Sequence, residues 1–258
     1  MEGSLAEAWE RHAHEWATWA RRPGFDSYWR FNRDAFFALA PPPGRRTLEV
    51  GCGEGRVARD LAARGHRVAG VDTSQTLIAL AREAAPELEL AVADAAALPF
   101  PDAQFDLVVA FMSLQDVDDL DGAVREAARV LEPGGRLAAA IVHPLNSAGA
   151  FASDDPASPF VVDGSYLASR RYTDTIEREG LTMTFASEHR PLEAYSRALE
   201  AAGFAIEALR EPAVPPGVWD ERATGRWSRI PLFLHLLAVR SSGGVAAGRS
   251  AATSSTLR

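Results

Sequence analysis

TLEVGCGEGR, residues Thr47–Arg56, places three glycines at alternate positions directly after a short apolar run. An apolar run that meets a glycine-rich turn is typical of a strand that leads into a helix. Glycine has no side chain, so a ligand can approach the backbone of this turn closely and meet the free N–H groups of the following helix. The stretch therefore predicts a ligand-binding turn between a first strand and a first helix.

Strands and helices alternate along the chain from this turn onward. The apolar run at 105–111 is nearly continuous, as in a strand with both sheet faces covered. The alternation predicts an α/β fold, a doubly wound, Rossmann-like, seven-stranded and mostly parallel sheet with helices on both faces. We expect helices at 56–64, 74–83, 121–131 and 192–202, and strands at 47–50, 66–71, 88–92, 105–111, 136–142, 204–209 and 232–239.

The expected main domain spans residues 45–240. Three segments of the chain do not follow the alternation of strands and helices. Residues 1–40, here the cap segment, carry aromatics at helical spacing with a break at Pro23-Gly24, which predicts an N-terminal helical cap. Residues 145–190, here the lid segment, are too long for a bare loop, so we expect a substrate-facing insertion with its own helix or strand pair. Residues 241–258 are small and polar, which is typical of a disordered tail.

Composition narrows the classes of partner. The formal net charge of −8 disfavours a nucleic-acid partner, because phosphate binding needs a basic face. No apolar run approaches the roughly 18 residues of a membrane span, so no membrane partner is expected. The single cysteine, Cys52, excludes an internal disulfide and a cysteine-based metal cluster, and it favours a reducing, cytoplasmic setting. We expect a monomer or a homodimer without a metal.

The residues around the turn separate it from other nucleotide-binding loops. A dinucleotide fingerprint needs a third glycine where this chain has Arg56, and a P-loop needs a lysine that is absent here. Instead, LEVGCGEG is followed in order by GVDTS, VADAAALPFPDAQFDLVV and RVLEPGGRLA. With these motifs the chain resembles, over about 47–142, the class I S-adenosylmethionine-dependent methyltransferases, in particular the small-molecule branch called methyltransferase type 11.

The resemblance implies a site for S-adenosylmethionine as cofactor. The glycine turn would contact the methionine part, Glu49 would bind the ammonium directly or through water, and Asp72 would hold the ribose. Asp94 would accept from the adenine amino group, beside Thr73 and Ala95, while the end of the fourth strand would flank the sulfonium. The implied cofactor residues are Glu49, Gly51, Cys52, Gly53, Gly55, Asp72, Thr73, Asp94, Ala95, Phe111, Met112 and Ser113.

Two aromatic residues of the cap segment are further candidates for the cofactor site. Tyr28 and Trp29 would shield the sulfonium and make cation–π contacts with it. The alternative is that both rings pack on the core of the sheet. The side chain of Cys52 is expected to be a small buried thiol rather than a nucleophile.

Residues that act on the acceptor are expected at the ends of the fourth and fifth strands and in the lid segment. Methyl transfer from a sulfonium is an in-line displacement, and a base is needed only where the nucleophile must lose a proton. His143 is a candidate base or substrate hydrogen-bonder, and His189 is a second catalytic candidate. The alternative for His143 is hydrogen bonding to local backbone, and the alternative for His189 is a helix-capping or salt-bridge role. The candidate substrate residues are Gln115, Arg170, Arg171 and Tyr172.

The predicted function is methyl transfer from S-adenosylmethionine to a small-molecule acceptor. A non-catalytic or regulatory S-adenosylmethionine-binding protein is one alternative. An NAD(P)-dependent oxidoreductase is another, although Arg56 and the absence of a Y-x-x-x-K motif count against it. The acidic run QDVDDLD at 115–121 is interpreted as helix capping plus a solvated loop rather than as a metal site.

Overall fold

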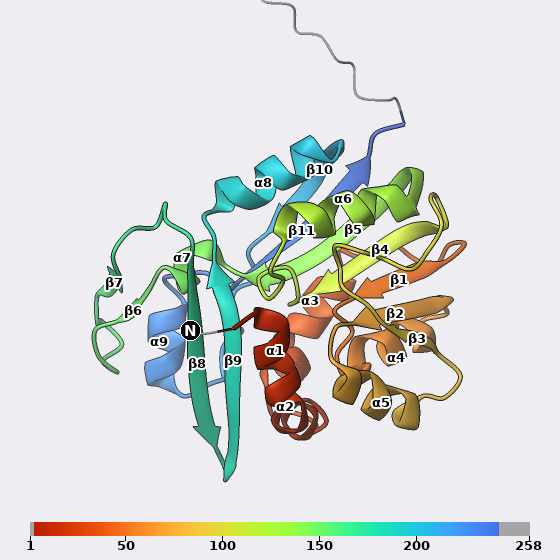
Figure 1. The fold of residues 1–258 in the computed structure, drawn as a ribbon. Helices are drawn as coiled ribbons and strands as arrows, with labels where there is room; N and C mark the ends of the chain where they lie inside the picture. Colours follow the sequence, from red (N-terminus) through yellow and green to blue (C-terminus); the bar gives the residue numbers. More distant parts are fainter. Residues whose placement is uncertain (1–2, 243–258) are drawn as a thin grey trace, which may run out of the picture.

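The computed structural model describes residues 3–242, and one seven-stranded sheet forms its centre (Figure 1). The strands lie in the order β10-β11-β5-β4-β1-β2-β3, and β11 is antiparallel to both of its neighbours while the other pairs are parallel. The predicted mostly parallel sheet is confirmed. Its strands are β1 Thr47–Val50, β2 Val68–Asp72, β3 Glu89–Val92, β4 Phe105–Phe111, β5 Leu131–Val142, β10 Phe204–Arg210 and β11 Phe233–Arg240.

Helices cover both faces of the sheet, and the side chains of β4 alternate between the two layers. Val108 and Ala110 pack with α6 (Leu120–Val130) and α8 (Leu192–Ala201). Leu107, Val109 and Phe111 pack on the other face with α4 (Arg56–Ala63) and α3 (Arg33–Phe37). Burial on both faces explains why this strand is apolar at successive positions. The helix predicted at 74–83 is α5 (Gln75–Ala84), whose N-cap Ser74 accepts from Leu77 N at 3.0 Å.

The strand predicted at 136–142 is longer than expected. β5 begins at Leu131, because Leu131 already pairs with Phe105 before the register shifts to the pair Leu107 and Arg136. The preceding helix accordingly ends at Val130. Pro133, Gly134 and Gly135 therefore lie within β5, where the register of its pairing with β4 shifts.

The cap segment folds into short helices that pack on the lid segment. α1 (Leu5–Arg11) and α2 (Ala13–Ala20) precede a π-helical turn, η1 (Tyr28–Asn32), which runs into α3. The rings of Trp9, Trp16 and Trp19 lie edge-on to Phe185, with centroids 6.5, 6.1 and 6.1 Å away. The aromatic face of these helices is thus buried against the lid.

The lid segment contains two antiparallel strand pairs. α7 (Pro144–Ser147) leads into β6 (Gly149–Phe151), which pairs with β7 (Phe160–Val162). β8 (Arg170–Arg178) and β9 (Leu181–His189) form a long hairpin that stands beside α1 in Figure 1. The last helix, α9, spans Glu221–Trp227. No helix within residues 3–242 is long and apolar enough to cross a membrane. The predicted tail lies outside the described residues from 243 onward.

Candidate functional site

A cavity of about 1600 Å³ lies at the carboxyl ends of β1, β2, β4 and β5. This is where doubly wound sheets bind their ligands. The cap segment and the β8–β9 hairpin supply further walls. Because single small-ligand pockets usually hold about 300–1000 Å³, this cavity has room for a cofactor and a second molecule beside it.

The glycine turn forms one wall of the cavity, and its glycines are required by the fold as well. Gly51, Gly53 and Gly55 have φ of 71°, 54° and 83°, a left-handed backbone that favours glycine. A Cβ on Gly51 would lie 2.4 Å from Ser113 Cβ, and one on Gly53 would lie 3.1 Å from Trp16 Nε1. The turn therefore packs closely between the end of β4 and the cap segment. This packing alone requires glycine at these positions, whether or not a ligand binds.

Asp72, at the end of β2, holds this turn in place. Its Oδ2 accepts from Gly53 N at 2.8 Å, and its Oδ1 accepts from Ser74 N at 2.9 Å. Burial raises the pKa of Asp72, while these backbone N–H groups lower it. A carboxylate offers about four acceptor sites, so Asp72 keeps free lone pairs on the cavity side. A ligand diol is a suitable donor for them.

Glu49 is a buried carboxylate with an unused oxygen. It is 1% exposed and lines the cavity, and within residues 3–242 its Oε2 has no hydrogen-bond partner. Burial and the charges of Asp72 and Glu54 raise the pKa of Glu49 well above its ordinary value, and nearby arginines lower it. An unpaired polar atom is costly to bury. A positively charged ligand group at this position would remove that cost.

The remaining cofactor candidates surround these two carboxylates. Asp94 is exposed in the cavity, where its Oδ1 accepts from Ala96 N at 2.8 Å. At the end of β4, Met112 has a φ of 56°, so the chain turns sharply there, and Ser113 Oγ donates to Val50 O at 2.7 Å. The thiol of Cys52 is buried, and burial raises its pKa well above the ordinary value, which makes it a poor nucleophile.

Two of the cofactor candidates, Gly55 and Trp29, do not line the cavity, whereas the others do. Gly55 is the N-cap of α4 and faces Ala81 of α5. The indole N–H of Trp29 donates to Ala20 O at 3.1 Å, away from the cavity. Trp16, which sequence reasoning did not select, stands over the glycine turn instead.

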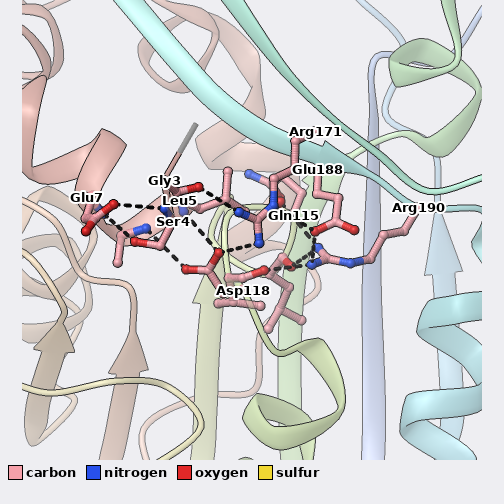
Figure 2. A network of polar contacts seen from close by, with 12 residues as sticks. Gly3, Ser4, Leu5, Glu7, Gln115, Asp118, Arg171, Glu188 and Arg190 are labelled. Carbon is pink, nitrogen blue, oxygen red and sulfur yellow. Dashed lines mark hydrogen bonds and ion pairs between the residues drawn. The ribbon is translucent and has the colours of Figure 1, made fainter. Parts of the chain in front are cut away.

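Of the substrate candidates, three line the cavity and one does not. Gln115, Arg170 and Tyr172 line the cavity. Arg171 does not; its guanidinium donates to Asp118 Oδ1 at 2.6 Å and to Gly3 O at 2.9 Å. Figure 2 shows this arginine reaching from β8 towards Asp118 and the start of α1. Its contacts join the hairpin to the cap segment.

Neither histidine proposed for catalysis lines the cavity. His143 is the N-cap of α7, where its Nδ1 accepts from Leu145 N at 3.0 Å, and its Nε2 lies 2.9 Å from Glu211 Oε1. His189 is fully buried, with Ser147 Oγ 2.7 Å from Nδ1 and Tyr166 O 2.9 Å from Nε2. His143 has the local backbone partner that was its alternative, whereas His189 contacts Ser147 and Tyr166, 42 and 23 residues away. Neither ring enters the function proposed below.

Asp116 is the cavity residue that sequence reasoning missed. It was grouped with a solvated acidic loop, yet it lies against the lid, where Ser187 Oγ donates to its Oδ1 at 2.6 Å. Burial raises the pKa of Asp116 well above its ordinary value. The capping interpretation holds for its neighbours, since Asp119 accepts from Gly122 N and Asp118 accepts from Leu5 N. The position of Asp116 just after β4 was the only available signal.

Comparison with known proteins places the chain among methyltransferases. Residues 48–139 match the methyltransferase domain family. A probable S-adenosylmethionine-dependent methyltransferase of Mycolicibacterium smegmatis is 32% identical over 183 residues, covering 69% of this chain and 68% of that protein. A demethylmenaquinone methyltransferase of Beutenbergia cavernae is 37% identical over 117 residues, 45% of this chain, and the match spans about half of that relative's length (48%).

A solved structure extends the similarity over most of the chain. The crystal structure of an S-adenosylmethionine-dependent methyltransferase from Mesorhizobium loti superposes with a TM-score of 0.67 at 27% identity. The superposition covers 83% of this chain and 98% of that one. The likeness therefore includes the sheet and reaches beyond the segment that carries the motifs.

Proposed function

We propose that this chain, which belongs to the S-adenosylmethionine-dependent methyltransferases, transfers a methyl group to a small-molecule acceptor. The observation that carries the proposal is a buried oxygen of Glu49 that has no hydrogen-bond partner among residues 3–242 and lies in the cavity beside the glycine turn. S-adenosylmethionine, the family's cofactor, supplies an electrophilic methyl group on a sulfonium, together with an ammonium and a ribose diol. The cavity contains acceptors suited to both of these polar groups.

Each cofactor group has a proposed partner in the cavity. Glu49 binds the ammonium, since its free oxygen is buried and negatively charged groups surround it. Asp72 accepts from the ribose hydroxyls through the lone pairs that Gly53 and Ser74 leave free. Asp94 accepts from the adenine amino group. Thr73 and Ala95 lie beside the adenine ring, and the backbone of the glycine turn contacts the methionine part. The remaining proposed contacts surround the methyl group and come from Tyr28, Phe111, Met112 and Ser113. The residues of the turn are Gly51, Cys52 and Gly53.

A small acceptor, rather than a polymer, suits the enclosed second half of the cavity. Aromatic side chains of the cap segment and residues of the β8–β9 hairpin line it. The relative from Beutenbergia cavernae is named for a small-molecule acceptor, which supports the same class here. We propose that the cap and lid segments exclude water and align the acceptor, which is the main requirement of an in-line displacement. A cytoplasmic location remains part of this proposal.

Glu49→Gln tests the proposal through binding and stability. By calorimetric titration, the wild type is expected to bind S-adenosylmethionine and S-adenosylhomocysteine but not NADH. The variant should bind both cofactor forms about 10-fold or more weakly, because a hydrogen bond to a charged group contributes about 1.5–3 kcal/mol. Without ligand the variant should melt at a higher temperature, because the raised pKa of Glu49 means that its charged form destabilises the folded state at neutral pH.

Asp174→Asn is the matched control, because Asp174 also lines the cavity and the substitution removes the same charge. Its affinity for the cofactor should equal that of the wild type. The proposal would be wrong if the wild type bound NADH in place of S-adenosylmethionine, or if Glu49→Gln bound the two cofactor forms with the same affinity as the wild type. Cofactor binding with no transfer to any acceptor would leave a binding protein instead of an enzyme.

A further inference from the structure

We propose that Asp116 binds the hydroxyl group of an aromatic acceptor and takes its proton as the methyl group is transferred. This inference rests on the proposed function and names the acceptor class for the same cavity. The acceptor is a phenol whose ring lies against the tryptophan wall and whose hydroxyl points at the carboxylate.

The loop that carries Asp116 is fixed from both sides. Glu188 N donates to Gln115 O at 2.9 Å, which ties the loop to β9. Arg190 Nη2 donates to Val117 O at 2.7 Å and to Glu188 Oε2 at 2.8 Å. Figure 2 shows Gln115, Glu188 and Arg190 converging at this junction. A carboxylate held between two braced neighbours is positioned before any ligand arrives, as a reacting group should be.

Asp116 keeps unused acceptor capacity towards the cavity. Ser187 Oγ donates to its Oδ1 at 2.6 Å, and Gln115 Nε2 donates to its Oδ2 at 3.1 Å. A carboxylate has about four acceptor sites, so each oxygen can accept once more. Asp118 also lines the cavity, but it already accepts from Leu5 N, Ala6 N and the cationic guanidinium of Arg171. Of these two acids, Asp116 has fewer donors and, in the part of the chain that the structure describes, no arginine bonded to it, so it is better suited to receive a ligand proton.

An aromatic wall adjoins this carboxylate. The indole N–H of Trp9 donates to Ala186 O at 3.0 Å, which places Trp9 beside Ser187 and hence beside the partner of Asp116. Trp9 and Trp16 lie edge-on with centroids 5.8 Å apart, and both line the cavity together with Phe185. Aromatic rings prefer such edge-to-face and offset contacts. A flat ring therefore fits this wall better than a branched aliphatic group.

The charges around Asp116 suit a phenolic proton. Burial and the charge of Asp72 raise the pKa of Asp116, while Ser187, Gln115 and Arg190 lower it, and the net pKa lies well above the ordinary value. The other titratable neighbours, Tyr172 and Tyr195, have pKa values raised by burial and stay neutral. A base acts best on a proton of similar pKa, and a phenol near 10 is a closer match than an aliphatic hydroxyl, which resembles water at about 15.7.

The proposed step is balanced. The phenolic oxygen forms the new bond to the methyl carbon while its proton passes to a carboxylate oxygen of Asp116. The electron pair of the broken sulfur–carbon bond stays on sulfur as the neutral thioether. The protonated carboxyl then returns its proton to water after the product leaves.

The test compares 4-nitrophenol with 4-nitroanisole, its methyl ether, in the presence of saturating S-adenosylhomocysteine. The wild type should bind the phenol about 10-fold or more tightly than the ether, as expected for a hydrogen bond to a charged group. Asp116→Asn should remove that preference and leave the affinity for S-adenosylhomocysteine unchanged. Asp174→Asn, with the same charge removed elsewhere in the cavity, should keep the preference. The absorption spectrum of bound 4-nitrophenol, recorded at a pH at which the free phenol is neutral, gives a second readout, because a proton acceptor at the site shifts it relative to that of the free phenol.

Ser187→Ala is a second variant that separates this role from a structural one. It removes the 2.6 Å donor to Asp116, so the preference for the phenol should increase. A decrease in that variant, an unchanged preference in Asp116→Asn, or failure of the wild type to bind the phenol would overturn the inference. Failure of S-adenosylhomocysteine to bind the wild type would instead overturn the proposed function, so the two failures are distinguishable.

Discussion

Asp26→Asn is expected to loosen the attachment of the cap segment to the glycine turn. Arg56 begins α4 directly after the turn, is 9% exposed, and has its Nη1 2.7 Å from Asp26 Oδ2. Its guanidinium also stands 4.3 Å from the ring centroid of Tyr28 and 4.7 Å from that of Trp16. One buried cation thus joins three residues of the cap segment to the helix that follows the glycines.

The expected loss can be worked from this geometry. Removing one partner of a buried ion pair costs about 3–5 kcal/mol, because the other charge is left without compensation. The two aromatic rings continue to attract the guanidinium, each by about 0.5–2 kcal/mol. We therefore expect the free energy of unfolding to fall by about 3 kcal/mol. With a urea dependence of about 2–3 kcal/mol per molar, the unfolding midpoint should fall by about 1–1.5 M.

Urea unfolding followed by tryptophan fluorescence and circular dichroism measures this loss. Glu193→Gln is the matched control, since it removes the same charge from a pair with Arg197 in which the side chains are 63% and 76% exposed. That change should cost less than about 0.5 kcal/mol. Adding Arg56→Met to Asp26→Asn should restore part of the stability, because the uncompensated cation is gone. A loss in Asp26→Asn no larger than that of the control would refute the reasoning.

Two further predictions concern the glycine turn and a buried histidine. Gly51→Ala should lower the free energy of unfolding by about 1–3 kcal/mol more than Gly164→Ala, measured by thermal unfolding. Both glycines have a φ of 71°, but only at Gly51 would the new Cβ clash, because it would lie 2.4 Å from Ser113 Cβ. Equal losses of stability in the two variants would contradict this. Burial lowers the pKa of His235 from 6.5 to about 4, so the folded state resists its protonation and roughly 3 kcal/mol of stability should be lost as the pH falls through that interval. His235→Gln should remove that part of the pH dependence in urea unfolding, and an unchanged dependence would argue against it.

The proposed cofactor part of the cavity contains residues that the sequence already indicated, because short contiguous motifs build it. The glycines follow β1 directly, and Asp72 ends β2, so their meeting at one edge of the sheet follows from the alternation alone. Tyr28 and Trp29 show where this reasoning stops. The π-helical turn at 28–32 buries Tyr28, which borders the cavity, against Phe111 and directs Trp29 back to Ala20, and sequence spacing does not indicate such a turn.

The proposed acceptor part of the cavity could not be predicted because its contacts join distant residues. Asp116 looks like one acid in a solvated run until Ser187, 71 residues later, packs against it. His143 is a different case, because its contact is local: Pro144 begins α7 immediately after it and the ring becomes the helix cap. The adjacent proline already allowed that alternative in the sequence.

The loop after β4 is where the sheet, the cap segment and the lid segment meet. Asp118 accepts from the N-terminal N–H groups of α1 and from Arg171 of β8, so one carboxylate joins all three (Figure 2). Asp116, two residues earlier, faces the cavity from the same braced loop. Because these contacts hold the loop against both segments, we expect substitutions in the loop to alter acceptor binding while the proposed cofactor contacts of the glycine turn stay intact.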